Sequence, residues 1–284
     1  MNIIRDSAVG ILGRVHPSPD GATRIAILTD IHANLPALTA VLSEVRRLGC
    51  GRIYHAGDLI DIGPYPAEVV DLARACDMIC VRGNHEAWLM GDAPVGLGKG
   101  LRDQAEMEHE QWTLSRLDQA QRDFIRGMPP IVRETIDSVH FSVVHFALAA
   151  DGRSISDVSP LWSDARILDL FARTPGALIC FGHLHERRFN RTYRGRRFLN
   201  PGAVGCSPRG EARFATVDIA GGSGSQSTGS HTIAGRCLRP TMRSGCRPAT
   251  SSARCSSACD APVQPVAPSL STTHGPLALQ QPLS

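Results

Sequence analysis

The chain lacks the strong positive charge that nucleic-acid-binding proteins carry. Its formal net charge is +3 over 284 residues. The residues beyond Ala220 contain five arginines and one aspartate, which is +4, so the first 220 residues carry about −1. Binding to a phosphate backbone needs clustered lysine and arginine. We therefore expect no strong nucleic-acid footprint on the folded part, and any charged substrate must be met locally.

Long apolar runs and paired cysteines are missing too. No run approaches the roughly 20 apolar residues of a membrane span, and the polar start MNIIRDSAVGILGRV does not resemble a signal peptide. The nine cysteines form no CxxC pair, and no histidine at zinc-finger spacing accompanies the last four, Cys237, Cys246, Cys255 and Cys259. These absences predict a cytoplasmic protein with reduced thiols and no membrane partner.

Strand and helix patterns alternate in the first part of the chain. Residues 24–29 form a short apolar run typical of a buried parallel strand. An amphipathic helix follows, with Asn34 as its N-cap, Pro36 in its first turn and Gly49 at its end. The same rhythm continues with a strand at 53–56, a helix at 67–75 and a strand at 78–81. It predicts an α/β sheet with crossover helices.

The second half of the chain reads mainly as β structure after a helical insert. Residues 88–128 are polar and helix-rich, and we expect them to cover one end of the sheet. A hairpin is predicted from strands at 131–135 and 139–144, with its turn at Asp137–Ser138. Further strands are expected at 177–181, 197–199 and 213–219.

The composition changes abruptly after Ala220, where the chain continues GGSGSQSTGS and becomes rich in serine, proline, glycine and arginine. Such a segment buries too little apolar surface to offset its ordering entropy. We therefore divide the chain into an N-terminal extension (1–23), one folded domain (24–220) and a low-complexity, disordered tail (221–284) without further strands. A translation-frame artefact is the alternative explanation of the tail.

Metal-binding residue types stand where the predicted strands end. Asp30 and His32 follow the first strand, Asp58 the second and Asn84 the third, while His145, His183 and His185 follow two later strands. In open α/β sheets the carboxyl ends of strands form the ligand-binding rim. A lone DxH or GD is a common loop sequence, whereas GNH and especially GHLH are more specific. Together, and in this order, they predict one metal site.

These motifs resemble those of the calcineurin-like metallophosphoesterases. DIH, GD, GNHE, an isolated histidine and GHLH occur in that family's order, and the likeness covers about residues 24–219. The stretches DIHANLPALTAVL and LNPGAVGCSPRGEARFATVD are most similar to the small bacterial and archaeal phosphodiesterase-type branch. The resemblance implies a four-layer αββα sandwich carrying the helical insert.

The resemblance also implies two divalent metal ions. One would be bound by Asp30, His32, Asp58 and His185, and the other by Asp58, Asn84, His145 and His183, with Asp58 bridging. These donors suit Mn²⁺ best, with Fe, Zn²⁺ or Mg²⁺ as alternatives. Two such ions would lower the pKa of a bridging water and clamp the phosphoryl oxygens for in-line attack by hydroxide.

Two further residues gain roles from the family pattern. His85 corresponds to the catalytic histidine that does not bind metal and that stabilises or protonates the leaving oxygen. Asp61 stands where the protein-phosphatase branch has an aspartate that orients this histidine, or it is an ordinary turn aspartate.

The chain departs from the family pattern at two positions. Ile62 replaces the phosphate-gripping arginine of GDxxDRG, and bidentate arginine pairing is what favours monoesters. Phe146 follows His145 where this branch has glycine, which leaves the local loop shape open.

We therefore expect a metal-dependent phosphodiesterase acting on small phosphodiesters or nucleotides. A phosphomonoesterase or serine/threonine phosphoprotein phosphatase is one alternative, and a dinucleoside polyphosphate hydrolase is another. A catalytically silent scaffold, like the retromer subunit of this fold, is the non-enzyme alternative, but the presence of His85 and all seven expected ligands argues against it. The native metals and the oligomeric state stay open.

Overall fold

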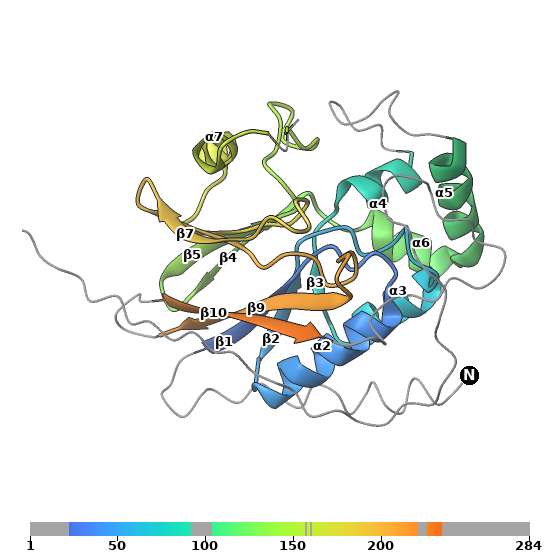
Figure 1. Ribbon diagram of the computed structural model, residues 1–284, viewed down its shortest axis with the longest axis horizontal. Coiled ribbons are helices and arrows are strands. Elements are labelled where there is room, and N and C mark those ends of the chain that lie inside the picture. The colour runs from blue at the N-terminus through green and yellow to red at the C-terminus, as the bar shows by residue number, and fades with distance from the viewer. Residues whose placement is uncertain (1–22, 92–103, 157, 160, 221–225, 235–284) are drawn as a thin grey trace, which may run out of the picture.

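The computed structural model describes residues 23–91, 104–156, 158–159, 161–220 and 226–234. Two five-stranded sheets lie face to face, with helices outside them (Figure 1). The first has the order β10-β9-β1-β2-β3 and the second the order β4-β5-β6-β8-β7. The predicted N-terminal extension lies outside the described residues, except for Thr23, which opens β1.

The first sheet is built around the parallel strands β1 (Thr23–Leu28), β2 (Arg52–His55) and β3 (Ile79–Cys80). The connecting helices α2 (Leu35–Arg47) and α3 (Pro66–Ala75) have apolar contacts with its outer face. β9 (Glu211–Ile219) pairs antiparallel with β1. Because successive side chains of a strand alternate in direction, Ile25 and Ile27 face the other sheet while Ala26 and Leu28 face the helices.

Helix α2 begins and ends as the sequence predicts. The side chain of Asn34 accepts a hydrogen bond from the backbone N–H of Ala37 at 3.1 Å, which satisfies one of the free donors of the first turn. Beyond the helix, Gly49 has a φ of +68°, a left-handed conformation that glycine adopts without a steric penalty.

The second sheet contains the hairpin of β4 (Ile131–Ile136) and β5 (Val139–Val144), the parallel strands β6 (Leu178–Cys180) and β8 (Arg196–Asn200), and β7 (Phe189–Tyr193). Asp137 and Ser138 have φ values of 46° and 69°, which confirms the tight turn at these residues. Helix α7 (Asp164–Asp169) and the 3₁₀ helix η1 (Leu170–Arg173) cover the outer face. This arrangement confirms the four-layer αββα sandwich.

Apolar clusters fill each of the three spaces between the four layers. The cluster between the sheets includes Ile25, Tyr54 and Phe141, and Tyr54 meets Phe141 edge-on at 5.3 Å between ring centroids. A second cluster lies between the first sheet and its helices. The third gathers phenylalanines under α7 and η1. The two sheets are therefore fixed against each other by continuous packing, which positions their carboxyl ends together.

The predicted helical insert is confirmed for its described residues. It begins at the end of α4 (Asn84–Leu89) and contains α5 (Gln104–Arg116) and α6 (Gln119–Arg126). The three helices gather at one end of the sandwich (Figure 1). Residues 92–103 lie outside the described part of the chain.

The prediction that no strand follows Ala220 is wrong. Residues Gln226–Ala234 form β10, which pairs antiparallel with β9 along all nine of its residues. The sequence QSTGSHTIA has few large apolar residues, so the strand is held mainly by its backbone pairing, which gives β9 a second hydrogen-bonded neighbour. The tail prediction otherwise concerns residues 221–225 and 235–284, which lie outside the described residues.

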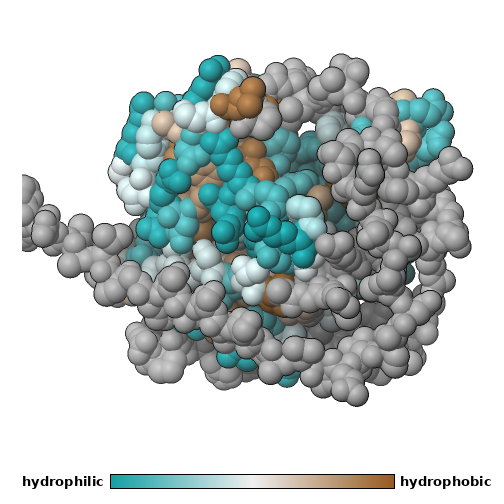
Figure 2. Space-filling model, viewed as in Figure 1, coloured by the Kyte–Doolittle hydropathy of each residue, from teal (hydrophilic) through white to brown (hydrophobic). Residues whose placement is uncertain are grey.

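Among the described residues, no helix is long and apolar enough to cross a membrane. On the face seen in Figure 2 the surface that is not grey is mainly hydrophilic, with apolar side chains visible between the polar ones.

Candidate metal centre

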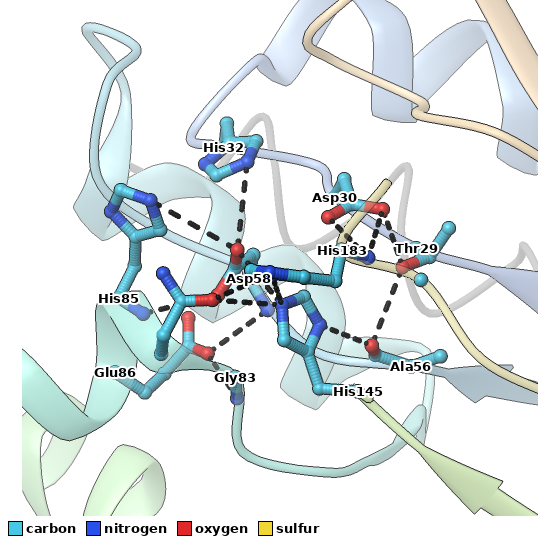
Figure 3. Close-up of polar contacts among 12 residues, drawn as sticks. Thr29, Asp30, His32, Ala56, Asp58, Gly83, His85, Glu86, His145 and His183 are labelled. Carbon is cyan, nitrogen blue, oxygen red and sulfur yellow. Dashed lines mark hydrogen bonds and ion pairs between the residues drawn. The ribbon is translucent and has the colours of Figure 1, made fainter. Parts of the chain in front are cut away.

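The expected metal ligands come from the carboxyl ends of strands in both sheets. Asp30 and His32 follow β1, and Asp58 follows β2. Asn84 and His85 open α4 just after β3. From the second sheet, His145 follows β5, and His183 and His185 follow β6. Figure 3 shows the side chains of His32, His145 and His183 gathered around Asp58.

These side chains form two groups that share Asp58. In the first group, one donor atom each of Asp30, His32, Asp58 and His185 lie within 4.8 Å of one another. In the second group the same holds for Asp58, His145 and His183. The amide oxygen of Asn84 lies 3.0 Å from Nε2 of His145 and 3.1 Å from Nδ1 of His183. The structure thus brings together all seven residues that the sequence analysis singled out as ligands.

The donor atoms in these groups fit divalent cations better than they fit one another. Nε2 of His32 faces Nε2 of His185 at 3.2 Å, and Nδ1 of His183 faces Nε2 of His145 at the same distance. A single proton bridges only one such nitrogen pair, whereas a cation accepts lone pairs from several nitrogens and oxygens at once. Imidazole, carboxylate and amide oxygen form a donor set suited to Mn²⁺, Fe and Zn²⁺.

Five of the seven side chains stand on backbone of left-handed conformation. The φ values are 51° for Asp30, 48° for His32, 58° for Asp58, 69° for His183 and 40° for His185. Outside glycine this region is uncommon and costs free energy, and such residues cluster at functional sites. Hydrogen bonds between loops hold this backbone conformation in place. Asp30 N donates to Gly57 O at 3.0 Å, and His32 N donates to Asp58 O at 3.0 Å.

The glycines of the motifs leave room for these side chains. A Cβ atom on Gly83 would collide with the carboxylate of Asp58, and a Cβ on Gly182 would collide with Thr29 and Asp30. This explains in physical terms why glycine precedes the polar residue in GNHE and in GHLH.

Charge around Asp58 is balanced by histidines. Burial would raise the pKa of Asp58, but the neighbouring His145 and His85 hold that pKa well below its usual range. Burial lowers the pKa of His32 well below its usual value and lowers the pKa of His183 to about 3. Both shifts favour the neutral ring, which is the form that binds a metal.

His85 stands beside the two groups, held by Asp61. Its Nδ1 lies 2.7 Å from Oδ2 of Asp61, and its Nε2 lies 4.0 Å from Oδ2 of Asp58. Burial would lower the pKa of His85, but the carboxylates of Asp58 and Asp61 raise it to about 10. Of the two roles considered for Asp61, the geometry favours that of orienting His85.

Sequence reasoning missed the support that α5 gives to Asp61. Thr113 donates from its hydroxyl to Oδ1 of Asp61 at 3.4 Å, and Nε2 of His109 lies 3.5 Å from the same oxygen. His109 and Thr113 are four residues apart on one helix and so share a face. The sequence shows that these two residues share a helix face, but it does not show that this face contacts Asp61.

Glu86, the last residue of GNHE, was missed as well. It is fully buried, and its carboxylate accepts backbone hydrogen bonds from Asp58, Leu59, Ile60 and Gly83 at 2.8–3.1 Å. Burial and the nearby charge of Asp58 raise the pKa of Glu86. The residue thus orders the loop that carries Asp58.

The two departures from the family pattern have different outcomes. Phe146 leaves His145 in place: its ring is buried in the third apolar cluster and lies 5.2 Å from the ring of His183. Ile62 is 38% exposed and brings no charge. Two nearby arginines have carboxylate partners: Arg187 is bound to Asp164, and Arg213 is bound to Glu186 and Glu211.

Comparison with known proteins gives three findings. The calcineurin-like phosphoesterase superfamily domain matches residues 23–222. A solved metallophosphoesterase from Sphaerobacter thermophilus is 27% identical with a TM-score of 0.54, over 76% of this chain and 89% of that one. A hypothetical protein from Pyrococcus horikoshii shares the fold, with 18% identity and a TM-score of 0.57, over 72% of this chain and 86% of that one.

One curated relative adds a partial match. An uncharacterized protein of Methanocaldococcus jannaschii is 31% identical over 112 residues, which are 39% of this chain and 44% of that protein. The matched part thus spans less than half of that relative.

Proposed function

Because the chain belongs to the calcineurin-like phosphoesterase superfamily, we propose that it is a phosphodiesterase that uses two divalent metal ions on small phosphodiesters or nucleotides. The observation that carries this proposal is the pair of donor groups sharing Asp58, with His85 standing beside them. A binding module would need the donor groups alone, whereas a positioned histidine outside both groups suits proton transfer to a leaving group.

Each of the two donor groups would hold one metal ion. Asp30, His32, Asp58 and His185 would hold one, and Asp58, Asn84, His145 and His183 the other. Bound there, two cations supply Lewis acidity and an activated water for attack on phosphorus. We propose that Mn²⁺ is one of the metals in use, because mixed oxygen and imidazole donors suit it.

The residues of the chain itself handle the proton of the leaving group. Asp61 accepts the Nδ1 proton of His85, which fixes the ring so that Nε2 is directed toward the Asp58 side of the site (Figure 3). A proton held on Nε2 is then available to the leaving oxygen of a bound ester. Thr113 and His109 contact the other oxygen of Asp61 and keep that carboxylate in position.

The choice of diester rests on the isoleucine at position 62 and on the partners of two arginines. Monoesters carry an extra negative charge, which enzymes commonly meet with bidentate arginines. Ile62 occupies the position of one such arginine, and Arg187 and Arg213 are bound to carboxylates. The site therefore suits a substrate whose second phosphate oxygen is esterified.

The decisive experiment compares bis-p-nitrophenyl phosphate with p-nitrophenyl phosphate, using the full chain loaded with Mn²⁺, Fe²⁺, Zn²⁺ or Mg²⁺. We expect the diester to be hydrolysed with the higher kcat/KM. His85→Ala should lower kcat by roughly 10²–10⁴-fold while the protein binds the same amount of metal. His140 lies on β5 away from the site, so His140→Ala is the matched control and should change kcat little.

Two results would contradict the proposal in different ways. A higher kcat/KM on the monoester would favour a phosphomonoesterase or a phosphoprotein phosphatase. A metal-loaded protein that cleaves neither ester, nor members of a wider phosphoester panel, would favour the silent scaffold.

We also propose that the enzyme works in the cytoplasm. The five described cysteines are unpaired thiols, and four of them are buried, which suits a reducing compartment. Fractionation of cells with an antibody against the protein tests this placement.

A further inference from the structure

A cysteine lies against the first donor group, although it was not among the expected ligands. Cys206 follows β8 in the sequence AVGCSP, and its sulfur lies within 4.8 Å of a ring nitrogen of His32 and a ring nitrogen of His185. These three residues form a third set whose atoms are close enough to hold a metal ion. Two of the three, His32 and His185, also belong to the first donor group.

The loop before Cys206 is fastened to the loop that carries Asp30 and His32. Val204 N donates to Thr29 O at 3.0 Å, and Gly205 N donates to Asp30 O at 2.9 Å. The side chain of Asn34 donates to Gly205 O at 3.0 Å. A Cβ atom on Gly205 would collide with the carbonyl of Ile31, so only glycine permits this approach. The position of Cys206 is thus set by contacts of the two preceding residues with the loop that follows β1.

The surroundings of Cys206 differ from those of the other described cysteines. Cys50, Cys76, Cys80 and Cys180 are buried among apolar side chains. Burial raises the pKa of Cys76 to about 11 and that of Cys50 to about 12. Cys206 is only partly buried, and its thiol is a hydrogen-bonding neighbour of His185. His32 is almost fully buried, and its Nδ1 has no hydrogen-bond partner among the described residues.

We propose that the thiolate of Cys206 is a further ligand of the metal ion held by Asp30, His32, Asp58 and His185. The proposal rests on the proposed function in one respect, that this group holds a metal ion. On binding, the S–H bond breaks, a sulfur–metal bond forms and the proton passes to solvent; nothing is oxidised or reduced.

A thiolate makes the two metal positions chemically unequal. Sulfur is a soft donor that favours Zn²⁺ or Fe²⁺ over Mn²⁺ and Mg²⁺. Among the described residues, the second group consists of Asn84 and two histidines beside Asp58 and includes no sulfur. The first position should therefore select a thiophilic ion, while the second accepts a harder one, so that the native pair contains two different metals.

The test uses Co²⁺, because a thiolate bound to cobalt gives a charge-transfer band in the near ultraviolet that imidazole and carboxylate do not give. We expect the full-length protein loaded with Co²⁺ to show this band, and Cys206→Ser to lose it while binding as much cobalt. Since four further cysteines lie at 237, 246, 255 and 259, a variant with serine at all four is the control and should keep the band. Cys206→Ser should weaken Zn²⁺ binding at least about tenfold, because loss of a residue that only supports a metal ligand already costs about this much. The change in Mn²⁺ affinity should be smaller.

The possible outcomes separate this inference from the proposed function. Cobalt bound without the band, or a band that persists in Cys206→Ser, would overturn the ligand role and leave the phosphodiesterase proposal standing. A wild-type protein that binds no cobalt, and shows none of its visible d–d absorption, would overturn both. Equal loss of Zn²⁺ and Mn²⁺ affinity in Cys206→Ser would overturn the claim of a thiophilic position.

Discussion

At the scale of single residues, the carboxylate of Glu86 accepts backbone hydrogen bonds from four residues, Asp58, Leu59, Ile60 and Gly83. These donors lie on the loop after β2 and on the turn before α4, the two segments that carry Asp58 and Asn84. One buried side chain outside the expected ligand set thus fixes the distance between two expected ligands.

Replacing this carboxylate by an amide should be costly. Glu86→Gln keeps the shape but presents an NH₂ group to backbone N–H donors, which leaves buried donors unsatisfied. We expect a loss of about 3 kcal/mol in the free energy of unfolding, measured by urea denaturation. Glu108→Gln, at an exposed glutamate of α5, is the matched control, and its change should stay within about 0.5 kcal/mol. Equal effects of the two substitutions would remove Glu86 from this role.

Most of the expected ligand residues could be found from the sequence because they carry a local signal. Asp58, Asn84 and His183 all follow a glycine and an apolar strand, and parallel strands bring such ends to one rim. Glu86 and Cys206 have no such signal. Their partners are backbone groups or side chains far away in sequence, so their roles follow from the three-dimensional path of the loops and not from spacing.

At the scale of elements, α5 connects the insert to the proposed proton donor. His109 and Thr113 both approach Oδ1 of Asp61, whose other oxygen is bonded to His85. The helix therefore acts on His85 through one carboxylate.

A double-mutant cycle tests this connection. Asp61→Asn should lower kcat by roughly tenfold or more, a part of what a general acid contributes, with KM and metal content unchanged. His109→Phe should lower kcat to a smaller extent in the wild-type background and have no further effect in Asp61→Asn, because coupled residues are not additive. His140→Phe provides the control. Additive losses for Asp61 and His109 would mean that α5 acts by another route.

Strand β10 gives the sandwich an acid-sensitive edge. The ring of His231 stacks on Phe214 at 4.7 Å, and its Nε2 lies 3.0 Å from the hydroxyl of Thr216. Burial lowers the pKa of His231 below its usual value. The unfolded chain therefore binds the proton more readily than the folded one, so stability is lost as pH falls below the unfolded pKa of about 6.5.

His231→Gln should remove this part of the acid sensitivity while leaving a polar group near Thr216. We expect the wild-type protein to lose more unfolding free energy than His231→Gln between about pH 7.5 and about pH 5, since other histidines titrate in both. His140→Gln, at an exposed position of β5, serves as the comparison and should follow the wild type. Parallel pH profiles for wild type and His231→Gln would contradict the assignment.

The elements that the sequence predicts are those formed by apolar residues that become buried. The runs around β1, β2 and β6 are buried on both faces and read as strands without ambiguity. β7 and β10 were missed because they are edge strands with polar sequences, FNRTY and QSTGSHTIA, whose order comes from pairing with a neighbour. The composition of a segment indicates whether it will be buried, but it does not reveal a strand that is held mainly by backbone hydrogen bonds.

At the scale of the whole molecule, the candidate metal centre joins the two sheets. Asp30, Asp58 and Asn84 come from the first sheet, and His145 and His183 come from the second. Ions held by this set would connect the two halves of the sandwich at their carboxyl ends, and they would bind the folded state alone.

Metal removal should therefore lower stability. At a free metal concentration of 100 Kd the bound state gains about 2.7 kcal/mol per site, which corresponds to a rise in Tm of about 5–10 °C for a domain of this size. Thermal unfolding with Mn²⁺ and with EDTA measures the difference. Asp58→Asn, which removes the shared carboxylate, should show a much smaller shift, and an identical Tm with and without metal in the wild type would contradict the bridge.

The left-handed backbone at Asp30, His32, Asp58, His183 and His185 has a consequence in time as well as in space. These conformations are held by hydrogen bonds between loops and by close packing of glycines, so they exist before an ion arrives. Capture of a metal then needs no slow rearrangement of the chain. The observed rate of metal binding should rise in proportion to metal concentration, because binding is then a single step. Its rate is limited by the loss of water from the hydrated ion.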